Sequence, residues 1–218
     1  MRTLGAVVLA SLGGLIPFTG YYLNQKPWLS PAAKLEDPWP DVRVRGAHSL
    51  SSEPPATAVP LLASALDDPS SEVRSAAAIA LGKHGDQAAS ALPALIHALD
   101  DEDSLAGCHA GEALSAMRSR SRDVLPPLIE RLKSPNATRA WCAATALGLL
   151  GADGAPAVAP LRAQLAHTDP NVRSAAGQAL GRIGPAAAPA LEALRVATSD
   201  ENQWVRKTAA EAIPRIER

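Results

Sequence analysis

The sequence predicts an all-α protein, a right-handed α-solenoid of about five helix-pair repeats that follows an N-terminal transmembrane helix. Two observations support this prediction. Residues 4–23 form a run of 20 residues without a charged side chain. Further along, the phrase EVRSAAAIALG around Val73 returns as NVRSAAGQALG around Val172, a distance that divides into three equal steps. The resulting period, about 33 residues, is typical of an array of stacked helix pairs and not of a single globular fold.

The first segment, residues 1–25, is predicted to be a signal anchor or transmembrane helix. Twenty residues at the helical rise span about 30 Å, the thickness of a bilayer core. Tyr21, Tyr22 and Trp28 fit the aromatic belt at a membrane interface. A cleaved signal peptide, leading to secretion, is one alternative, although a cleavage site is hard to find, and a buried core helix is another. The signal-like layout favours an extracytoplasmic, periplasmic position for the rest of the chain.

The next segment, residues 26–40, is predicted to be a proline-rich linker. It contains too many prolines for a helix interior, because proline lacks the backbone N–H and disfavours helical geometry in the residue before it. We therefore expect a partly extended chain between the membrane segment and the array, which is predicted to occupy residues 41–218. The prolines are Pro27, Pro31, Pro38 and Pro40.

The array divides into four contiguous units of equal length, followed by a half unit, and an earlier unit fits if its internal loop is slightly shorter. Each unit is predicted to form two amphipathic helices joined by a glycine turn. Stacking is required, since one helix pair buries too little apolar surface to offset its loss of conformational entropy. Alanine at the recurring interior positions lets the helices approach closely. The full units are 67–99, 100–132, 133–165 and 166–198.

The repeated phrase resembles the short bacterial HEAT-like repeats found in scaffold proteins and in phycobilin lyases. The resemblance covers residues 37–218 and implies an α-solenoid that mediates protein–protein contacts. It also implies that the arginine after the recurring valine bonds an aspartate or a carbonyl between units. This structural role falls to Arg43, Arg74, Arg173 and Arg206. The phrase itself is carried by Asp68, Pro69, Val73, Arg74, Ala77, Leu81, Gly82 and Gly85, and again by Asp169, Pro170, Val172, Arg173, Ala176, Leu180, Gly181 and Gly184.

The two central units depart from this phrase, because Gly107 and Ala140 stand where the arginine is expected. One interpretation is that neighbours on both sides buffer the centre of an array against sequence drift. The other is a partner-binding patch, for which a local basic edge is a candidate, although a charged turn is usually only solvated. The edge would comprise Arg118, Arg120, Arg122, Arg131 and Arg139.

Two tryptophans stand at repeat positions that are polar in sister units. Trp141 aligns with Ser75, and Trp204 aligns with Glu72. Large aromatic residues at such positions favour contact with a partner. The alternative is that each ring covers a loop of its own unit. His84 takes the place of Leu150 and is therefore interpreted as a core or half-buried histidine.

The two cysteines, Cys108 and Cys142, lie one residue more than a period apart. Neighbouring helices are about 8–10 Å apart, which puts two such residues near the limit of about 7 Å between Cα atoms for a disulfide. Cys108 aligns with Ser75 and is expected to point outward. Two separate thiols are therefore favoured, whereas a disulfide would indicate an oxidising compartment.

Several functions find no support in the sequence. A formal net charge of −1 leaves no basic field to hold a nucleic acid. The di-iron hydroxylases built of HEAT-like repeats use adjacent His-Glu pairs, which are absent here, and His109 with Glu112 is a lone approximation. No nucleotide-binding loop or serine-hydrolase motif is present. We therefore expect neither an enzyme nor a bound cofactor or metal.

These observations predict a membrane-anchored HEAT-repeat scaffold or adaptor. Its partner would be another protein, including a membrane complex, and residues 4–23 would contact the membrane. Two alternatives stay open. One is a structural subunit of a large membrane protein complex. The other is a phycobilin-lyase-like enzyme or chaperone acting on a chromophore-bearing protein, which rests on the fold alone.

Overall fold

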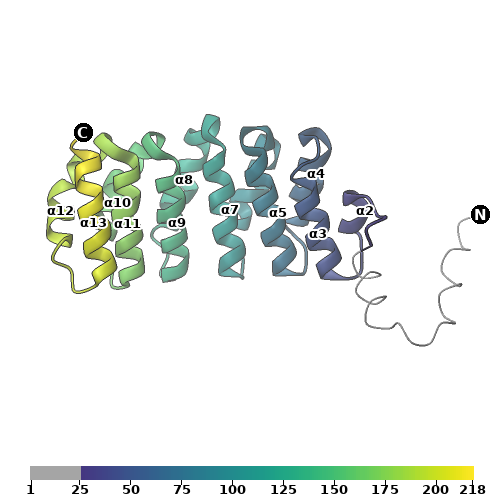
Figure 1. Cartoon of the computed structure of the whole chain (residues 1–218), viewed down its shortest axis with the longest axis horizontal. Coiled ribbons are helices and arrows are strands. Elements are labelled where there is room, and N and C mark those ends of the chain that lie inside the picture. Colours follow the sequence, from purple (N-terminus) through teal and green to yellow (C-terminus); the bar gives the residue numbers. More distant parts are fainter. Residues whose placement is uncertain (1–25) are drawn as a thin grey trace, which may run out of the picture.

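A computed structural model describes residues 26–218, and all regular elements in this range are helices (Figure 1). The predicted anchor, residues 1–25 with Tyr21 and Tyr22, lies outside the described residues. Within residues 26–218, no helix has the length and apolar character needed to cross a membrane. The first helices of the successive units are α3 (Pro40–Leu50), α5 (Ser71–His84), α7 (Ser104–Ala116), α9 (Ala137–Leu149), α11 (Pro170–Ile183) and α13 (Gln203–Ile216).

The predicted period is confirmed, because the first helices from α5 to α13 begin at equal steps along the chain, at Ser71, Ser104, Ala137, Pro170 and Gln203. In all units after the first, the second helix is shorter than the first helix and a 3₁₀ segment precedes it. The second helices are α4 (Pro55–Ala65), α6 (Leu92–Ala98), α8 (Ser121–Arg131), α10 (Val158–Gln164) and α12 (Leu191–Ala197). The 3₁₀ segments are η1 (Gly85–Ala91), η2 (Arg118–Arg120), η3 (Gly151–Ala157) and η4 (Gly184–Ala190).

The turn between the two helices of a unit uses a left-handed glycine in three units. Gly85, Gly151 and Gly184 have φ values of 53°, 58° and 76°, a region that favours residues without a Cβ. The third unit has Arg118 at this place, and there the chain turns after Met117 with φ −86° and the short segment η2. The loss of one glycine therefore changes the local turn and leaves the register of the next unit intact.

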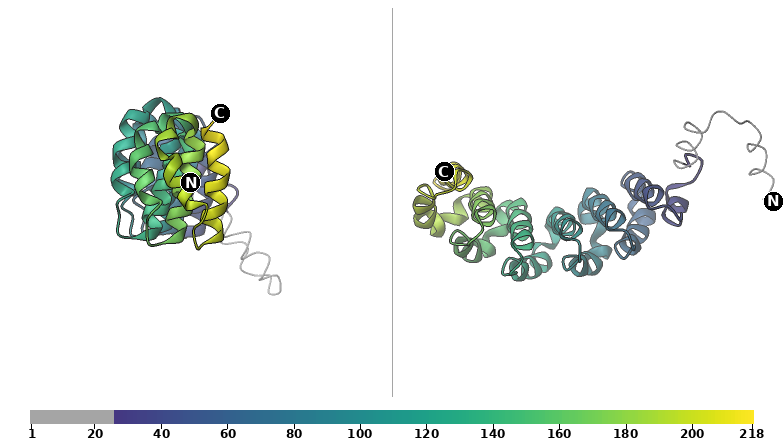
Figure 2. Two further views of the ribbon diagram at one scale, coloured as in Figure 1. Left: turned by 90° about the vertical axis from the view of Figure 1, so that its left-hand side faces the viewer. Right: turned by 90° about the horizontal axis from the view of Figure 1, so that it is seen from below.

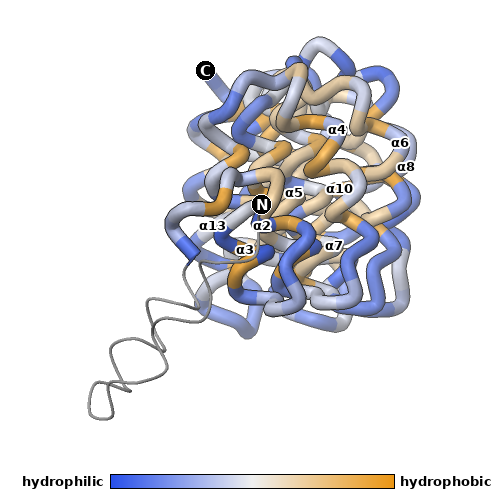
Figure 3. Tube along the Cα trace, turned by 90° about the vertical axis from the view of Figure 1, so that its right-hand side faces the viewer, coloured by the Kyte–Doolittle hydropathy of each residue, from blue (hydrophilic) through white to orange (hydrophobic). Residues whose placement is uncertain are grey.

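The helices form two layers in a curved array. Figure 2 shows the array from below, with α3, α5, α7, α9, α11 and α13 along its inner, concave side and the second helices along its outer side. We call the solvent-facing surface of these first helices the inner face. In Figure 3 the hydrophilic residues gather at the loops at both ends of the helices, and the apolar residues lie between them.

The core lies between the two layers and is built from leucines, while alanines and glycines fill the seams between units. The close stacking of first helices requires these small residues. A Cβ on Gly148 would lie 2.8 Å from the Cα of Ala179, and one on Gly181 would lie 2.9 Å from the Cα of Ala212. The fully buried leucines include Leu50, Leu62, Leu81, Leu95, Leu114, Leu128, Leu147, Leu161 and Leu180.

The predicted proline-rich, partly extended linker over residues 26–40 contains a short helix at its centre, which the sequence prediction did not include. Helix α2 (Pro31–Leu35) begins after Ser30, whose Oγ accepts a hydrogen bond from the Ala33 amide at 3.2 Å, and it packs on α3. Pro31 and Pro40 each occupy the first position of a helix, where a missing N–H leaves no hydrogen bond unmade. The number of prolines in residues 26–40 predicted that no helix forms there, but two of them, Pro31 and Pro40, lie where a helix begins.

Candidate functional site

The predicted repeat arginines join neighbouring units, and Arg74 shows how. Its Nε and Nη2 atoms donate to the two carboxylate oxygens of Asp101, each at 2.7 Å. Its Nη1 atom donates to the carbonyl of Asp68 at 2.9 Å. The side chains of Arg74 and Asp101 are only 10% and 6% exposed. Arg43 with Asp68 and Arg173 with Asp200 make the same contacts, so each of these three arginines bonds an aspartate of the next unit and a carbonyl of its own loop.

We call each such arginine–aspartate pair a rung. The aspartate also holds its own loop, since Oδ1 of Asp101 accepts the amide of Asp103 at 2.8 Å. Burial alone raises the pKa of Asp101, but the hydrogen bonds from Arg74 and from the Asp103 amide outweigh it and hold that pKa below its ordinary value. A rung thus fixes the start of one unit against the first helix of the unit before it.

The rungs at the two ends of the array differ from the inner ones. Arg206 in α13 donates Nη1 to the carbonyls of Asp200 and Glu201 at 2.8 and 2.9 Å. It is exposed, and within residues 26–218 no carboxylate completes its rung. At the other end, Asp37 holds the equivalent loop position and pairs with Lys26.

The centre of the array lacks rungs, and both halves of the pair are replaced there. Gly107 and Ala140 stand in place of the arginine, and Ser134 and His167 stand in place of the aspartate. The loop contact persists, because the side chains of Ser134 and His167 still accept the amide of the residue two positions later. The departures noted in the sequence therefore affect the joints between units, while the fold of each unit is kept.

A disulfide between Cys108 and Cys142 joins α7 to α9 at this point, so the prediction of two separate thiols is wrong. The two Cα atoms are 5.0 Å apart, closer than general helix spacing suggests. Small residues allow this approach, since a Cβ on Gly111 would lie 3.5 Å from the Cβ of Ala146. Cys108 does not point outward as expected but is 6% exposed.

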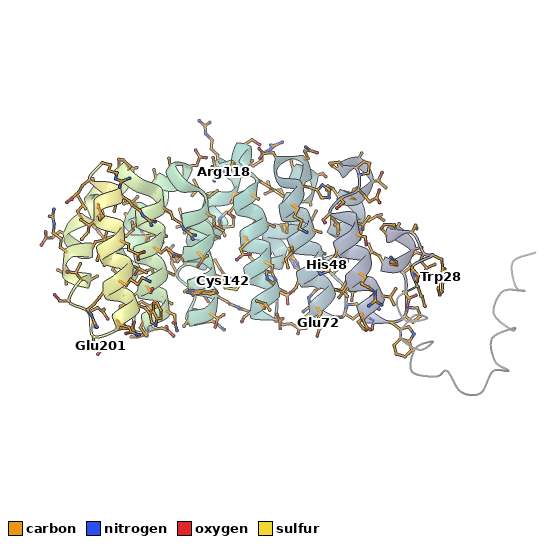
Figure 4. The ribbon with its side chains drawn as sticks, in the orientation of Figure 1. Trp28, His48, Glu72, Arg118, Cys142 and Glu201 are labelled. Carbon is orange, nitrogen blue, oxygen red and sulfur yellow. A yellow bond between two sulfur atoms is a disulfide. The ribbon has the colours of Figure 1, made fainter. Side chains whose placement is uncertain are left out.

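The five arginines of the predicted basic edge do not gather in one place. Arg118 lies at one end of the helices, as Figure 4 shows, with Arg120 and Arg122 beside it in the chain and exposed. Arg131 and Arg139 lie at the other end, where Arg131 pairs with Asp100. The single edge expected from the sequence is therefore divided into an exposed turn and a largely buried pair.

The inner face carries exposed apolar side chains from several units. Trp141 and Trp204 are 41% and 57% exposed, so neither ring belongs to the core. Leu105 and Leu149, at 59% and 37% exposed, lie on the same side of the array, on α7 and α9. The sequence prediction missed Leu105, although this residue occupies the same repeat position as Trp204, which a comparison of units could have revealed.

A groove of about 350 Å³ lies beside Leu105 on the inner face. It runs between α3, α5 and α7, and is lined by His48, Glu72, Ile79 and Leu105 among others. His84, interpreted from the sequence as a core or half-buried residue, is half-buried, with Nε2 3.1 Å from the carbonyl oxygen of Leu50. The inner face thus combines an open hollow with protruding apolar side chains.

Comparison with known proteins gives the same architecture. The sequence model of the family described as HEAT repeats matches residues 27–104 and 125–214, and the gap between these segments falls in the third unit, which lacks both the repeat arginine and the turn glycine. No curated protein sequence matches the chain.

Similar solved structures share the repeat fold at low sequence identity. A designed armadillo repeat protein in complex with the peptide (KR)4 is 21% identical, with a TM-score of 0.63, covering 85% of this chain and 98% of the other. The complex of CpcE and CpcF of phycocyanin lyase from Nostoc sp. is 23% identical, with a TM-score of 0.61, covering 88% and 79%. An engineered protein is 22% identical, with a TM-score of 0.62, covering 86% and 97%.

Proposed function

Because this chain belongs to the HEAT-repeat family, we propose that it is a membrane-anchored scaffold or adaptor that binds another protein along its inner face and has no catalytic activity of its own. The observation that carries the proposal is the set of exposed apolar side chains on the inner face, Leu105, Trp141, Leu149 and Trp204. Aromatic residues that stand exposed on an otherwise polar surface are the usual anchors of protein interfaces.

The anchor of this scaffold is residues 4–23, the uncharged segment at the start of the sequence. Helix α2 begins at Pro31, only a few residues after the apolar segment, and it packs directly on the array. The connection between the apolar segment and the first helices is therefore short in sequence. The array would therefore sit close to the membrane surface, where its partner would be a membrane protein or complex.

The Cys108–Cys142 disulfide supports an extracytoplasmic position for the array, since disulfides persist in oxidising compartments such as the periplasm. The likeness to the phycocyanin lyase complex concerns the fold alone at 23% identity, and it does not extend the proposal to a chromophore.

The proposal is tested by affinity capture from solubilised membranes followed by mass spectrometry, using the full chain and a Trp141→Ala/Trp204→Ala double variant. We expect capture of the partner to fall at least about tenfold in the double variant, because hot-spot aromatic residues contribute about 2 kcal/mol or more. The melting temperature should change by less than about 2 °C, because exposed side chains contribute little to stability.

Val196→Ala is the matched control, since Val196 is 71% exposed but lies on α12 in the outer layer. It should leave capture unchanged. Equal capture by the wild type and the tryptophan variant would contradict the inner face as the binding surface. A partner recovered in fixed stoichiometry through several steps of purification would instead favour the structural-subunit alternative.

The anchor gives a separate prediction. Deleting residues 1–25, which leaves the Lys26–Asp37 pair in place, should move the protein from the membrane fraction to the soluble fraction. The far-ultraviolet circular dichroism of the shortened chain should stay helical, because the array contains its own core. A shortened chain that still sediments with membranes would contradict the anchoring role of these residues.

A further inference from the structure

A guanidinium occupies the place of the missing rung between α7 and α9. In a complete rung, Nη1 of Arg74 donates to the carbonyl of the residue six positions earlier, Asp68. In the next unit the arginine is replaced by Gly107, and the matching carbonyl is that of Asp101. Arg139, which comes from α9, donates its Nη2 to this carbonyl at 2.9 Å. The neighbouring unit thus supplies the guanidinium that Gly107 lacks.

The carboxylate half of this rung is absent. Ser134 holds the loop position of Asp101, and its Oγ accepts the Asn136 amide at 3.2 Å, but it has no carboxylate to offer. The Nε atom of Arg139 is buried and has no hydrogen-bond partner within residues 26–218. In a complete rung this is one of the two atoms that bind the aspartate.

Within residues 26–218 Arg139 forms no ion pair, although it lies close enough to Asp101 to help lower the pKa of that carboxyl. The side chain of Arg131 is 11% exposed and pairs with Asp100. Burial first, and the nearby charge of Arg139 second, lower the pKa of Arg131, which indicates that the two guanidinium groups lie close together. Asp101 is already held by Arg74, and the one bond described for the Arg139 side chain goes to a neutral carbonyl. Arg131, Arg139 and Asp100 together carry one positive charge, which a single added negative charge would balance.

The cluster is reachable from outside the protein. An open groove of about 430 Å³ lies at the loop end of α6, α8 and α9, with Ser134 in its lining. Its charged lining residues are Arg131, Lys133 and Arg139 on one side of the balance and Asp100 and Glu130 on the other, which leaves one net positive charge. On the other side of the two arginines lies a small cavity of about 10 Å³ next to Cys142. A group entering the groove would therefore meet both guanidiniums and the Ser134 loop together.

We propose that Arg131, Ser134 and Arg139 together form a binding site for a carboxylate group. The bound carboxylate would contact Arg139 as the Asp101 carboxylate contacts Arg74 in a complete rung. The groove admits a carboxylate on a protruding side chain or at a chain terminus. That the carboxylate comes from the partner protein rests on the proposed function, whereas the site itself rests on the broken ladder of rungs alone.

The site is tested by thermal unfolding of the full chain with its disulfide intact, in sodium acetate up to about 100 mM, with sodium chloride holding the ionic strength constant. Acetate should raise the melting temperature by about 2–4 °C, because a ligand of the native state stabilises it. The rise should be lost in Arg139→Gln and kept in Arg122→Gln, an exposed arginine at the opposite end of the helices. An equal rise in both variants, or none in the wild type, would overturn the site.

Ser134→Asp provides a second test that does not depend on the loss of a group. It should complete the rung, raise the melting temperature in chloride by about 2–4 °C and abolish the further rise in acetate. Ser134→Asn is the uncharged control and should do neither. If the two variants behave alike, or if Ser134→Asp still responds to acetate, the assignment is wrong. A larger rise in inorganic phosphate than in acetate would also overturn the choice of a carboxylate.

Two peptides distinguish the sources of the carboxylate. Acetyl-Gly-Asp-Gly-amide offers a side-chain carboxylate, and acetyl-Gly-Gly-Gly with a free C-terminus offers a terminal one. A rise in melting temperature with either peptide supports the site and identifies the kind of group it takes. Reduced capture of the partner by Arg139→Gln would support a partner source. If Arg139→Gln captures as much partner as the wild type does, while the wild type still responds to acetate, the partner is not the source of the carboxylate. That result would not affect the inner-face proposal, which the tryptophan variant tests.

Discussion

Replacing Arg74 by alanine is expected to lower the free energy of unfolding by about 3–5 kcal/mol, the usual cost of removing one member of a buried ion pair. The substitution leaves the carboxylate of Asp101, only 6% exposed, without its two guanidinium bonds. It also removes the donor from the carbonyls of Asp68 and Pro69. The melting temperature should fall by roughly 10 °C, as measured by circular dichroism.

Arg206→Ala is the matched control for this prediction, because Arg206 makes the same carbonyl contacts from an exposed position without a carboxylate partner in residues 26–218. Its effect should stay within about 1 kcal/mol. Equal losses in the two variants would show that the carbonyl bonds, and not the ion pair, stabilise the joint.

The same rung predicts a pH dependence. The pKa of Asp101 in the folded state lies below its ordinary value. Its contribution to stability is therefore fully present above about pH 4, the usual range of an aspartate in an unfolded chain, and is lost as the pH falls through the folded-state pKa. The melting temperature of the wild type should fall more steeply below about pH 4 than that of Arg74→Ala. Parallel curves would contradict this contribution of Asp101.

Reduction of the Cys108–Cys142 disulfide is expected to destabilise the protein by about 3–4 kcal/mol. The bond closes a loop with a sequence separation of 34, and loop-closure entropy predicts a value of this size. It also joins α7 to α9 where no rung does, so no other covalent or ionic joint between these helices replaces it within the described residues. The melting temperature should fall by roughly 10 °C in dithiothreitol.

The Cys108→Ser/Cys142→Ser double variant controls for effects of the reductant, because its melting temperature should be low and independent of dithiothreitol. Alkylation of both thiols in protein purified without reductant would contradict the disulfide, and with it the argument for an oxidising compartment. Mass spectrometry under non-reducing conditions makes this measurement directly.

Much of the candidate site could be found in the sequence, but its geometry could not. The exposed positions of Trp141 and Trp204 follow from comparing equivalent residues across units, and Leu105 could have been found in the same way. The role of Arg74 followed from a resemblance to a known repeat. By contrast, the basic edge was grouped by nearness in the sequence, and helix α8 carries Arg118 and Arg131 to opposite ends of the array's helices.

The helix pair, its period and the register of every unit from α5 onward could be read from the sequence, because the helical spacing of apolar residues is a local pattern. The joints between units depend on tertiary packing. Cys108 meets Cys142, and Arg139 reaches Asp101, because small residues let neighbouring helices approach more closely than average spacing allows. Such contacts depend on the packing of residues about one period apart, which no pattern within a single unit records.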